Sequence, residues 1–103
     1  MNFDTIVTYV DKLDFVNKNT GEGSTMCRVV LQVPITKNVK KPYEMGTEGV
    51  SFFLNHQYYE NFKKIYLEGA KINVDIAFRK VYNVNDKKTS YKPYIKAVNH
   101  KDL

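Results

Sequence analysis

VSFFLNHQYYENFKKIYLEGAKINVDIAFRKVY, residues 50–82, is the stretch of sequence that decides the fold. It begins with an apolar run that predicts a short strand over residues 50–54. Apolar residues then recur at three- and four-residue spacing, which predicts a helix over residues 56–67. These residues are Tyr58, Phe62, Ile65 and Tyr66. Asn55 is a suitable N-cap for the helix, and Gly69 can end it in a left-handed conformation.

On both sides of this stretch, alternation of apolar and polar residues predicts longer strands. Three of them are expected over residues 4–16, 26–35 and 90–98. A fourth, over residues 71–82, directs four apolar side chains inward, which are Ile72, Val74, Ile76 and Phe78. In the strand over 26–35, Arg28 faces outward because the apolar residues alternate with it. Turns and loops are expected over residues 17–24, 36–49 and 83–89.

The predicted order is therefore strand, strand, strand, helix, strand, strand. A five-stranded Greek-key barrel with one helix between strands 3 and 4 is the OB-fold. Other small barrels and an open α+β sheet are compatible with the same string of elements. The position and length of the single helix favour the OB-fold, so the expected fold class is mainly β.

Length and composition indicate one folded domain, in a reducing compartment or indifferent to redox state. A chain of 103 residues predicts a single domain over residues 1–103. The one cysteine, Cys27, excludes an internal disulfide and is expected in the core. Residues 1–15 carry charges throughout and hold no apolar run as long as a signal peptide or membrane span. We therefore expect a cytoplasmic protein without a membrane partner.

The excess of positive over negative charge is confined to the last third of the chain. The formal net charge is +5 at pH 7. Residues 1–69 hold eight basic and eight acidic residues, whereas residues 70–103 hold eight basic and three acidic ones, an excess that equals the whole net charge. Such asymmetry indicates a polyanionic partner, either a nucleic acid or an anionic membrane surface. A solvated face that only maintains solubility has the same composition.

The segment FRKVYNVNDKKTSYKPYIKAV, residues 78–98, interleaves aromatic rings with cations. Cations attract a polyanion, and flat rings can stack on unpaired bases. A strand–turn–strand with both is therefore typical of a protein that binds single-stranded nucleic acid with little sequence preference. A basic hairpin whose rings are buried on one face would have the same pattern.

The C-terminal half resembles the OB-fold single-stranded DNA-binding proteins of bacteria and phages. The similar pieces are FFLN (residues 52–55), YYENFKKIYLEG (58–69), INVDIAFRKVY (72–82) and SYKPYIKAV (90–98). The resemblance implies that Tyr82 stands where the family places an aromatic residue at the base of the hairpin. The family commonly uses Trp to stack bases, and this chain has none. The resemblance is to the short members without an acidic tail, which phages and mobile elements often encode.

Strand parity selects which other rings could face a ligand. With Ile95 and Ala97 inward, Tyr94 faces outward. Lys96 shares its face, whereas Tyr91 is assigned to the core. The same argument turns Phe53 outward, because Phe52 beside it faces the core.

Parity turns Tyr82 inward unless the strand bulges, so the resemblance and the parity disagree on Tyr82. Phe53 is expected either to stack on a base or to be covered by a subunit partner. The cations expected to neutralise phosphates are Arg28, Arg79, Lys80, Lys87, Lys88 and Lys96. A basic part of the long loop could close over the strand, with Lys37, Lys40, Lys41 and Tyr43.

The expected function is sequence-tolerant binding of single-stranded DNA in replication or recombination, by a homo-oligomer that needs no cofactor and takes no small-molecule substrate. A protein-interaction or regulatory module of a phage or mobile element is the alternative, and single-stranded RNA is a further possible ligand. An enzyme is not expected. His56 lies at the predicted helix start and His100 in the tail, no Cys/His cluster has metal-ligand spacing, and no phosphate-binding Gly-rich loop occurs.

Overall fold

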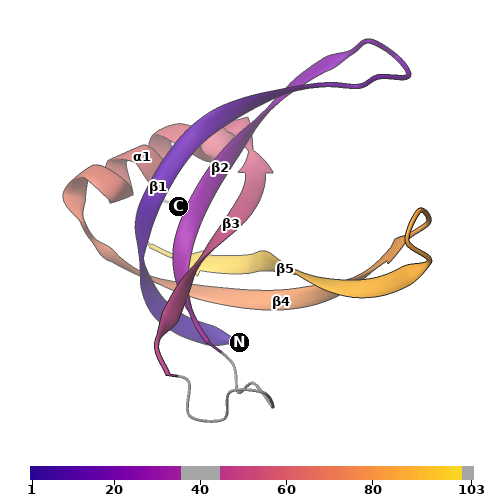
Figure 1. Cartoon of the computed structure of the whole chain (residues 1–103). Coiled ribbons are helices and arrows are strands. Elements are labelled where there is room, and N and C mark those ends of the chain that lie inside the picture. Colours follow the sequence, from indigo (N-terminus) through magenta and orange to yellow (C-terminus); the bar gives the residue numbers. More distant parts are fainter. Residues whose placement is uncertain (36–44, 101–103) are drawn as a thin grey trace. The chain divides into compact units, whose positions relative to one another are not determined.

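The computed structural model describes residues 1–35 and 45–100. In that part of the chain the protein is mainly β, with five antiparallel strands in one sheet and a single α-helix between the third and fourth strands (Figure 1). The strands are hydrogen-bonded in the order β3-β2-β1-β4-β5. The elements are β1 Asn2–Val16, β2 Gly23–Pro34, β3 Thr47–Asn55, a 3-10 turn η1 His56–Tyr58, α1 Tyr59–Glu68, β4 Lys71–Asn83 and β5 Lys88–Asn99.

The predicted order of elements is confirmed, and β2 and β3 each begin three residues before their predicted starts; β3 illustrates the cause. It begins at Thr47 and not at residue 50. The added residues pair with the end of β2, where Val33 lies opposite Glu48 and Pro34 opposite Thr47. Pairing with a neighbouring strand thus extends β3 into sequence with little strand propensity of its own.

Gly69 is confirmed as the C-cap of the helix, whereas Asn55 caps the 3-10 turn that precedes α1. Asn55 Oδ1 accepts a hydrogen bond from the backbone N–H of Gln57 at 3.0 Å, at the start of the 3-10 turn that leads into α1. Gly69 ends α1 with a φ of 64°, and its N–H donates to the carbonyl oxygens of Ile65 and Tyr66. These contacts satisfy backbone groups that a helix end leaves unpaired.

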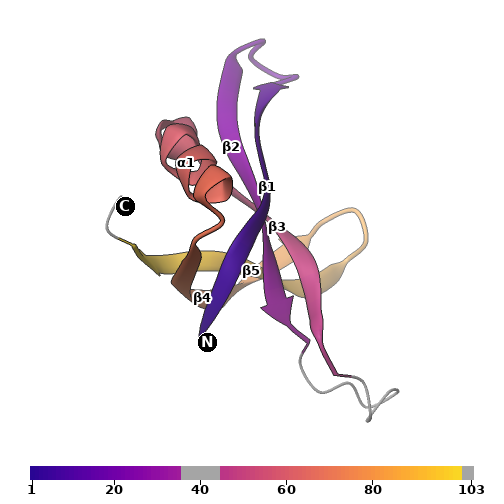
Figure 2. The same ribbon diagram turned by 90° about the vertical axis from the view of Figure 1, so that its left-hand side faces the viewer.

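The chain divides into two compact units, one of residues Thr5–Lys71 and one of Met1–Asp4 with Ile72–Leu103. In the first unit, α1 lies against β2 (Figures 1 and 2). The core of this unit comes from the inward faces of its strands and from the helix. Its buried apolar side chains are Val7, Cys27, Val29, Leu31, Val33, Phe52, Phe62 and Ile65.

The alternation predicted for β2 is confirmed, and the apolar stripe of the helix is narrower than predicted. Cys27 is fully buried, and burial raises the pKa of its thiol. Phe62 and Ile65 are buried as expected, whereas Tyr58 and Tyr66 are exposed. Only the middle of the predicted stripe therefore belongs to the core.

A bulge in β1 changes which of its side chains face outward. Val7 pairs with Leu31 and Tyr9 pairs with Val30, so Thr8 is an extra residue on β1. The Thr8 hydroxyl donates to the carbonyl oxygen of Val30 at 3.1 Å. The bulge shifts the alternation by one residue, so Val7 is buried while Tyr9, two residues further on, is exposed.

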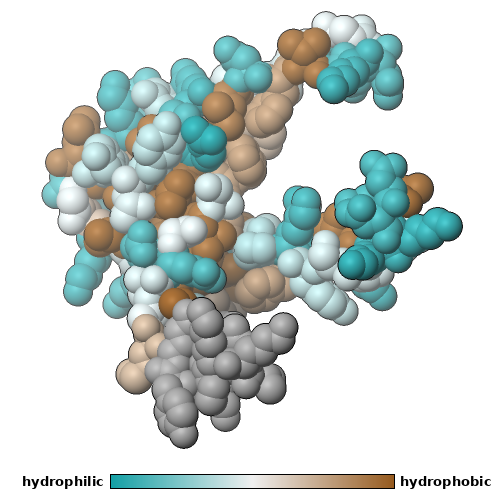
Figure 3. Space-filling model, viewed as in Figure 1, coloured by the Kyte–Doolittle hydropathy of each residue, from teal (hydrophilic) through white to brown (hydrophobic). Residues whose placement is uncertain are grey.

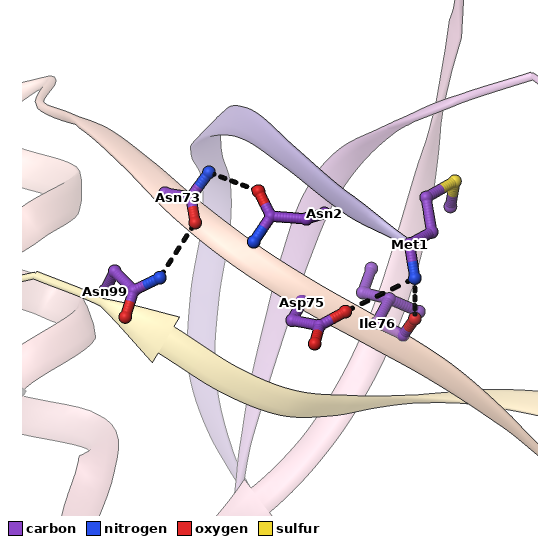
Figure 4. Close-up of polar contacts among 6 residues, drawn as sticks. All are labelled: Met1, Asn2, Asn73, Asp75, Ile76 and Asn99. Carbon is purple, nitrogen blue, oxygen red and sulfur yellow. Dashed lines mark hydrogen bonds and ion pairs between the residues drawn. The ribbon is translucent and has the colours of Figure 1, made fainter.

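In the second unit, the first residues of β1 are joined to β4 and β5 by side-chain amides (Figure 4). The Asn73 amide donates to Oδ1 of Asn2 at 2.7 Å and to Oδ1 of Asp4 at 3.0 Å. The Asn99 amide in turn donates to Oδ1 of Asn73 at 2.8 Å. One residue of β4 therefore connects three strands of this unit.

Met1 is held beside the middle of β4 (Figure 4). Its ammonium group donates to the carbonyl oxygen of Ile76 at 2.8 Å and lies 3.3 Å from Oδ1 of Asp75. The Ile76 N–H donates back to the Met1 carbonyl oxygen at 2.7 Å. Ile72, Val74 and Ile76 are buried on the inward face of β4, as predicted.

Candidate nucleic-acid interface

The β4–β5 hairpin carries most of the residues for which the sequence predicted contact with nucleic acid. Its cross-strand pairing runs from Asn73 opposite Asn99 to Asn83 opposite Lys88, next to the turn. Within the turn, Asn83 Oδ1 accepts from the backbone N–H of Asn85 at 3.0 Å. Lys87 adopts a left-handed conformation with a φ of 52°. These features close the turn, so the hairpin stays paired to its end.

One face of the outer part of the β4–β5 hairpin, residues 78–94, which we call the outer hairpin, is aromatic. Phe78 lies opposite Pro93, Lys80 opposite Tyr91, and Tyr82 opposite Thr89. Directly opposed residues point to the same side of a sheet, so these six residues form one surface, the aromatic face of the hairpin. Its rings are open to solvent: Phe78 is 54%, Tyr82 60% and Tyr91 67% exposed. The face therefore presents three exposed rings at positions that neighbour Lys80 in the ladder.

The sequence assigned Phe78 and Tyr91 to the core, and this assignment is wrong. The parity argument itself holds, because Phe78 continues the face of β4 that carries buried Ile76. Burial ends at Ile76 while the hairpin continues, so the same face changes from core to exposed surface. Alternation predicts which face of the strand a side chain lies on. It does not predict the position along the strand beyond which no other part of the protein buries that face. Tyr82 lies on this face and is exposed without a bulge.

The opposite face of the outer hairpin is cationic. Arg79 lies directly opposite Lys92, and Lys88 lies opposite Asn83. Tyr94, predicted to face outward, is exposed on this side, with the Arg79 guanidinium carbon 5.9 Å from its ring centroid. We call the surface of Arg79, Lys88, Lys92 and Tyr94 the cationic face of the hairpin. It combines positive charge with one ring.

Two further predicted cations lie at irregular positions of the hairpin. Lys96 lies between Ile95 and Ala97, where the pairing with β4 shifts by one residue. Lys87 belongs to the turn. Residues 78–96 hold six basic residues and one acidic residue, Asp86. The net charge of this segment is therefore +5, equal to that of the whole chain. Figure 3 shows hydrophilic residues gathered at the end of the hairpin, at the right of the view.

A second exposed aromatic surface lies on the outward face of the first unit. Phe53 is exposed and Phe52 buried, as predicted. The Phe53 ring meets the Phe15 ring edge to face, with centroids 6.1 Å apart. The bulge in β1 brings Tyr9 to the same outward face, because Asp11, two residues on, lies opposite Arg28, and Arg28 lies opposite Phe53. We call Tyr9, Phe15 and Phe53 the outward aromatic face.

Arg28 faces outward as predicted, but an acidic partner already neutralises it. Its guanidinium group donates to both carboxylate oxygens of Asp11, at 3.0 and 2.6 Å, and lies over the Tyr9 ring at 5.2 Å from the centroid. The hydrogen bonds from Arg28 lower the pKa of Asp11, and those to Asp11 and Tyr9 raise the pKa of Arg28. A phosphate would have to compete with Asp11 for this group, so Arg28 is a weaker candidate than the hairpin cations.

Seven of the predicted site residues lie on one hairpin: Arg79, Lys80, Lys87, Lys88, Lys96, Tyr82 and Tyr94. Arg28 and Phe53 lie in the other unit. Sequence reasoning missed the exposure of Phe78, Tyr91, Tyr9 and Phe15. The Thr and Tyr residues around the bulge gave no signal for the shift in β1. Lys37, Lys40, Lys41 and Tyr43 lie outside the described residues.

The described residues hold neither a metal-binding cluster nor a membrane-spanning helix. Across residues 1–35 and 45–100, no group of three or more His, Cys, Asp or Glu side chains could hold a metal ion. The helix in this part of the chain lacks the length and apolar character needed to cross a membrane.

No protein-family model matches the chain, and comparison with curated proteins gives no match.

Proposed function

We propose that this protein binds single-stranded DNA with little sequence preference and protects it during replication or recombination. The observation that carries the proposal is the aromatic face of the hairpin, where three exposed rings occupy positions next to Lys80 in the ladder. Exposed rings of this number are unusual on a basic segment that needs only to be soluble. Stacking on such rings contributes about 1–3 kcal/mol per base and tolerates any base, because every base has a π-face.

Binding starts with electrostatic capture. The cations of the hairpin attract the phosphate backbone, and the bound strand displaces counterions. Bases then stack on Phe78, Tyr82 and Tyr91, while the Lys80 ammonium group lies within the same face to meet a phosphate. Affinity should fall steeply with salt, since most of the attraction is between charges. No step of this binding requires a cofactor or a reaction, so the proposal is a binding protein and not an enzyme.

The proposed architecture is an OB-fold barrel of a short phage or mobile-element type, acting in the cytoplasm as a homo-oligomer. The element order with one helix between β3 and β4 supports it. In that architecture Phe53 would stack on a base or lie against a subunit partner.

A protein-interaction module is the second candidate, and one observation favours it. Phe15 and Phe53 form an edge-to-face pair beside the neutralised Arg28–Asp11 pair, so the outward aromatic face is apolar without excess charge. A surface of that kind suits a protein partner better than a polyanion. The two candidates differ in which aromatic surface carries the ligand.

A fluorescence titration tests the proposal. The chain has eight Tyr and no Trp, so its intrinsic emission reports tyrosine environments. Poly-dT is added at about 50 and 200 mM salt; stacking should quench the emission, and the affinity should be lower at the higher salt. Tyr91→Ala should remove part of the quenching, whereas Tyr66→Ala, which truncates an exposed tyrosine of α1, should leave the affinity unchanged.

The alternatives give different results in the same titration. Absence of both quenching and salt-dependent binding at low salt would refute the nucleic-acid proposal. Tighter binding of poly-U than of poly-dT would identify RNA as the ligand. Loss of binding in Phe53→Ala but not in Tyr91→Ala would move the site to the outward aromatic face.

A further inference from the structure

Both faces of the outer β4–β5 hairpin carry side chains that can bind nucleic acid. The aromatic face combines three rings with Lys80, and the cationic face combines three cations with Tyr94. Successive residues of a strand point to opposite sides, so Lys80 and its neighbour Arg79 cannot serve the same contact surface. Both faces are exposed over the same stretch of the hairpin.

One short segment of nucleic acid cannot contact both faces at once. Groups that touch opposite sides of the hairpin are separated by its backbone and by the side chains on each side, because successive side chains of a strand point to opposite faces. Lys80 lies directly across the ladder from Tyr91, so a base stacked on that ring would bring its own phosphate toward Lys80. The phosphate that meets Lys92 must therefore belong to another segment, either further along the same strand or on a second strand.

The cationic face has a feature that an anionic ligand would explain. Arg79 and Lys92 are directly opposed like charges, an arrangement that destabilises a β-ladder. The residues of this face include no carboxylate, and Asp86, the one acidic residue between 78 and 96, accepts a hydrogen bond from the Asn83 amide in the turn. A phosphate between the two cations would remove the repulsion and gain charge-assisted hydrogen bonds.

We propose that a single hairpin holds two segments of single-stranded DNA at the same time, one on each face, and so bridges strands. This inference rests on the proposed function and extends it from protection to bringing strands together. The aromatic face holds one segment by stacking, and the cationic face holds the other mainly through its phosphates. A protomer with both faces intact is sufficient, and either face alone binds DNA without bridging.

Energy transfer between two populations of short dT oligonucleotides, one with a donor dye and one with an acceptor dye, measures bridging. The full chain should bring donor and acceptor together at protein concentrations that bind both oligonucleotides. Two double variants separate the faces: Tyr82→Ala with Tyr91→Ala, and Arg79→Gln with Lys92→Gln. Their matched controls are Tyr66→Ala, and Lys18→Gln with Lys71→Gln, which lie outside the outer hairpin.

Each double variant should lose energy transfer but keep one kind of binding. The aromatic variant should lose tyrosine quenching and still bind in a salt-dependent way. The cationic variant should keep quenching, and its slope of log affinity against log salt should fall by about 1.4, or about 0.7 for each lost phosphate contact on a single strand. The controls should bridge like the original protein. Circular dichroism of each variant checks that the fold is retained.

Three results would overturn the inference. Energy transfer that persists in the cationic variant would mean that association of protomers bridges the strands. Parallel loss of quenching and salt dependence in both variants would mean that the two faces form one site. Quenching without energy transfer in the original protein would refute bridging and leave the proposed function intact. If neither quenching nor salt-dependent binding occurs, the proposed function itself fails.

Discussion

Arg79 and Lys92 lie directly opposite each other in the β4–β5 ladder, two cations in one cross-strand pair. Replacing Lys92 with Glu creates an opposite-charge pair at this position. We expect Lys92→Glu to raise the free energy of unfolding by about 0.2–1 kcal/mol, because opposed unlike charges stabilise a ladder that like charges weaken. The same change should weaken DNA binding. Urea denaturation and the poly-dT titration measure the two effects.

A charge change elsewhere distinguishes a local effect from a change in net charge. Lys18→Glu alters the net charge equally and lies in the turn between β1 and β2. It should not stabilise the hairpin and should weaken DNA binding less. Equal stabilisation by both substitutions would mean that the Arg79–Lys92 repulsion has no energetic consequence.

Ile76 and Phe78 lie on one face of β4 and should respond in opposite ways to truncation. Ile76 is 1% exposed and Phe78 is 54% exposed. We expect Ile76→Ala to lower the free energy of unfolding by about 2–5 kcal/mol, as for other buried aliphatic residues. Phe78→Ala should change stability little, within about 0.5 kcal/mol, and should weaken poly-dT binding. Strong destabilisation by Phe78→Ala would mean that the ring is covered in solution.

This pair also shows what the sequence could predict. Alternation placed Ile76 and Phe78 on one face, and that is correct. Whether a face is covered depends on which residues lie over it in three dimensions, and no local pattern contains that information. The sequence therefore identified the hairpin and its cations, but it assigned Phe78 and Tyr91 to the core.

The helix was better predicted because its signals are local. Asn55 and Gly69 act through hydrogen bonds to residues within four positions of them, so their spacing alone marks the start of the 3-10 turn and the end of α1. The bulge at Thr8 depends instead on how β1 pairs with β2, which lies more than 20 residues away in the sequence. The outward position of Tyr9 consequently could not be read from alternation.

The ion pair of Arg28 with Asp11 should make stability depend on pH in the acid range. The hydrogen bonds from Arg28 lower the pKa of Asp11 in the folded protein below its ordinary value of 3.8. A lowered folded-state pKa stabilises the protein at pH values above the unfolded pKa, and this contribution is lost as the pH falls through the folded pKa. Asp11→Asn should therefore be less stable than the original protein at pH 7, with a difference that shrinks below pH 3.8.

Urea denaturation at a series of pH values measures this difference. The same substitution in an Arg28→Gln background is the control, since the cation that lowers the pKa of Asp11 is then absent. In that background the difference should vary much less with pH. A difference in the original background that stays constant from neutral to acid pH would mean that Asp11 and Arg28 do not interact in solution.

Gly69 tests whether the helix end depends on a left-handed residue. Its φ is 64°, and a Cβ added there would meet no atom within 4 Å, so the effect of Gly69→Ala is conformational and not steric. We expect the free energy of unfolding to fall by about 1 kcal/mol, because an L-residue in this conformation costs about 1–2 kcal/mol and the less flexible unfolded chain offsets part of that. Gly69→Asn should cost less, since Asn tolerates the left-handed region.

Gly23→Ala is the matched control: its added Cβ would meet only the Phe15 carbonyl oxygen, at 3.8 Å, and its φ lies outside the left-handed region. Urea denaturation of the three variants should rank Gly69→Ala as the least stable, and equal stability of Gly69→Ala and Gly23→Ala would show that this helix end does not require glycine.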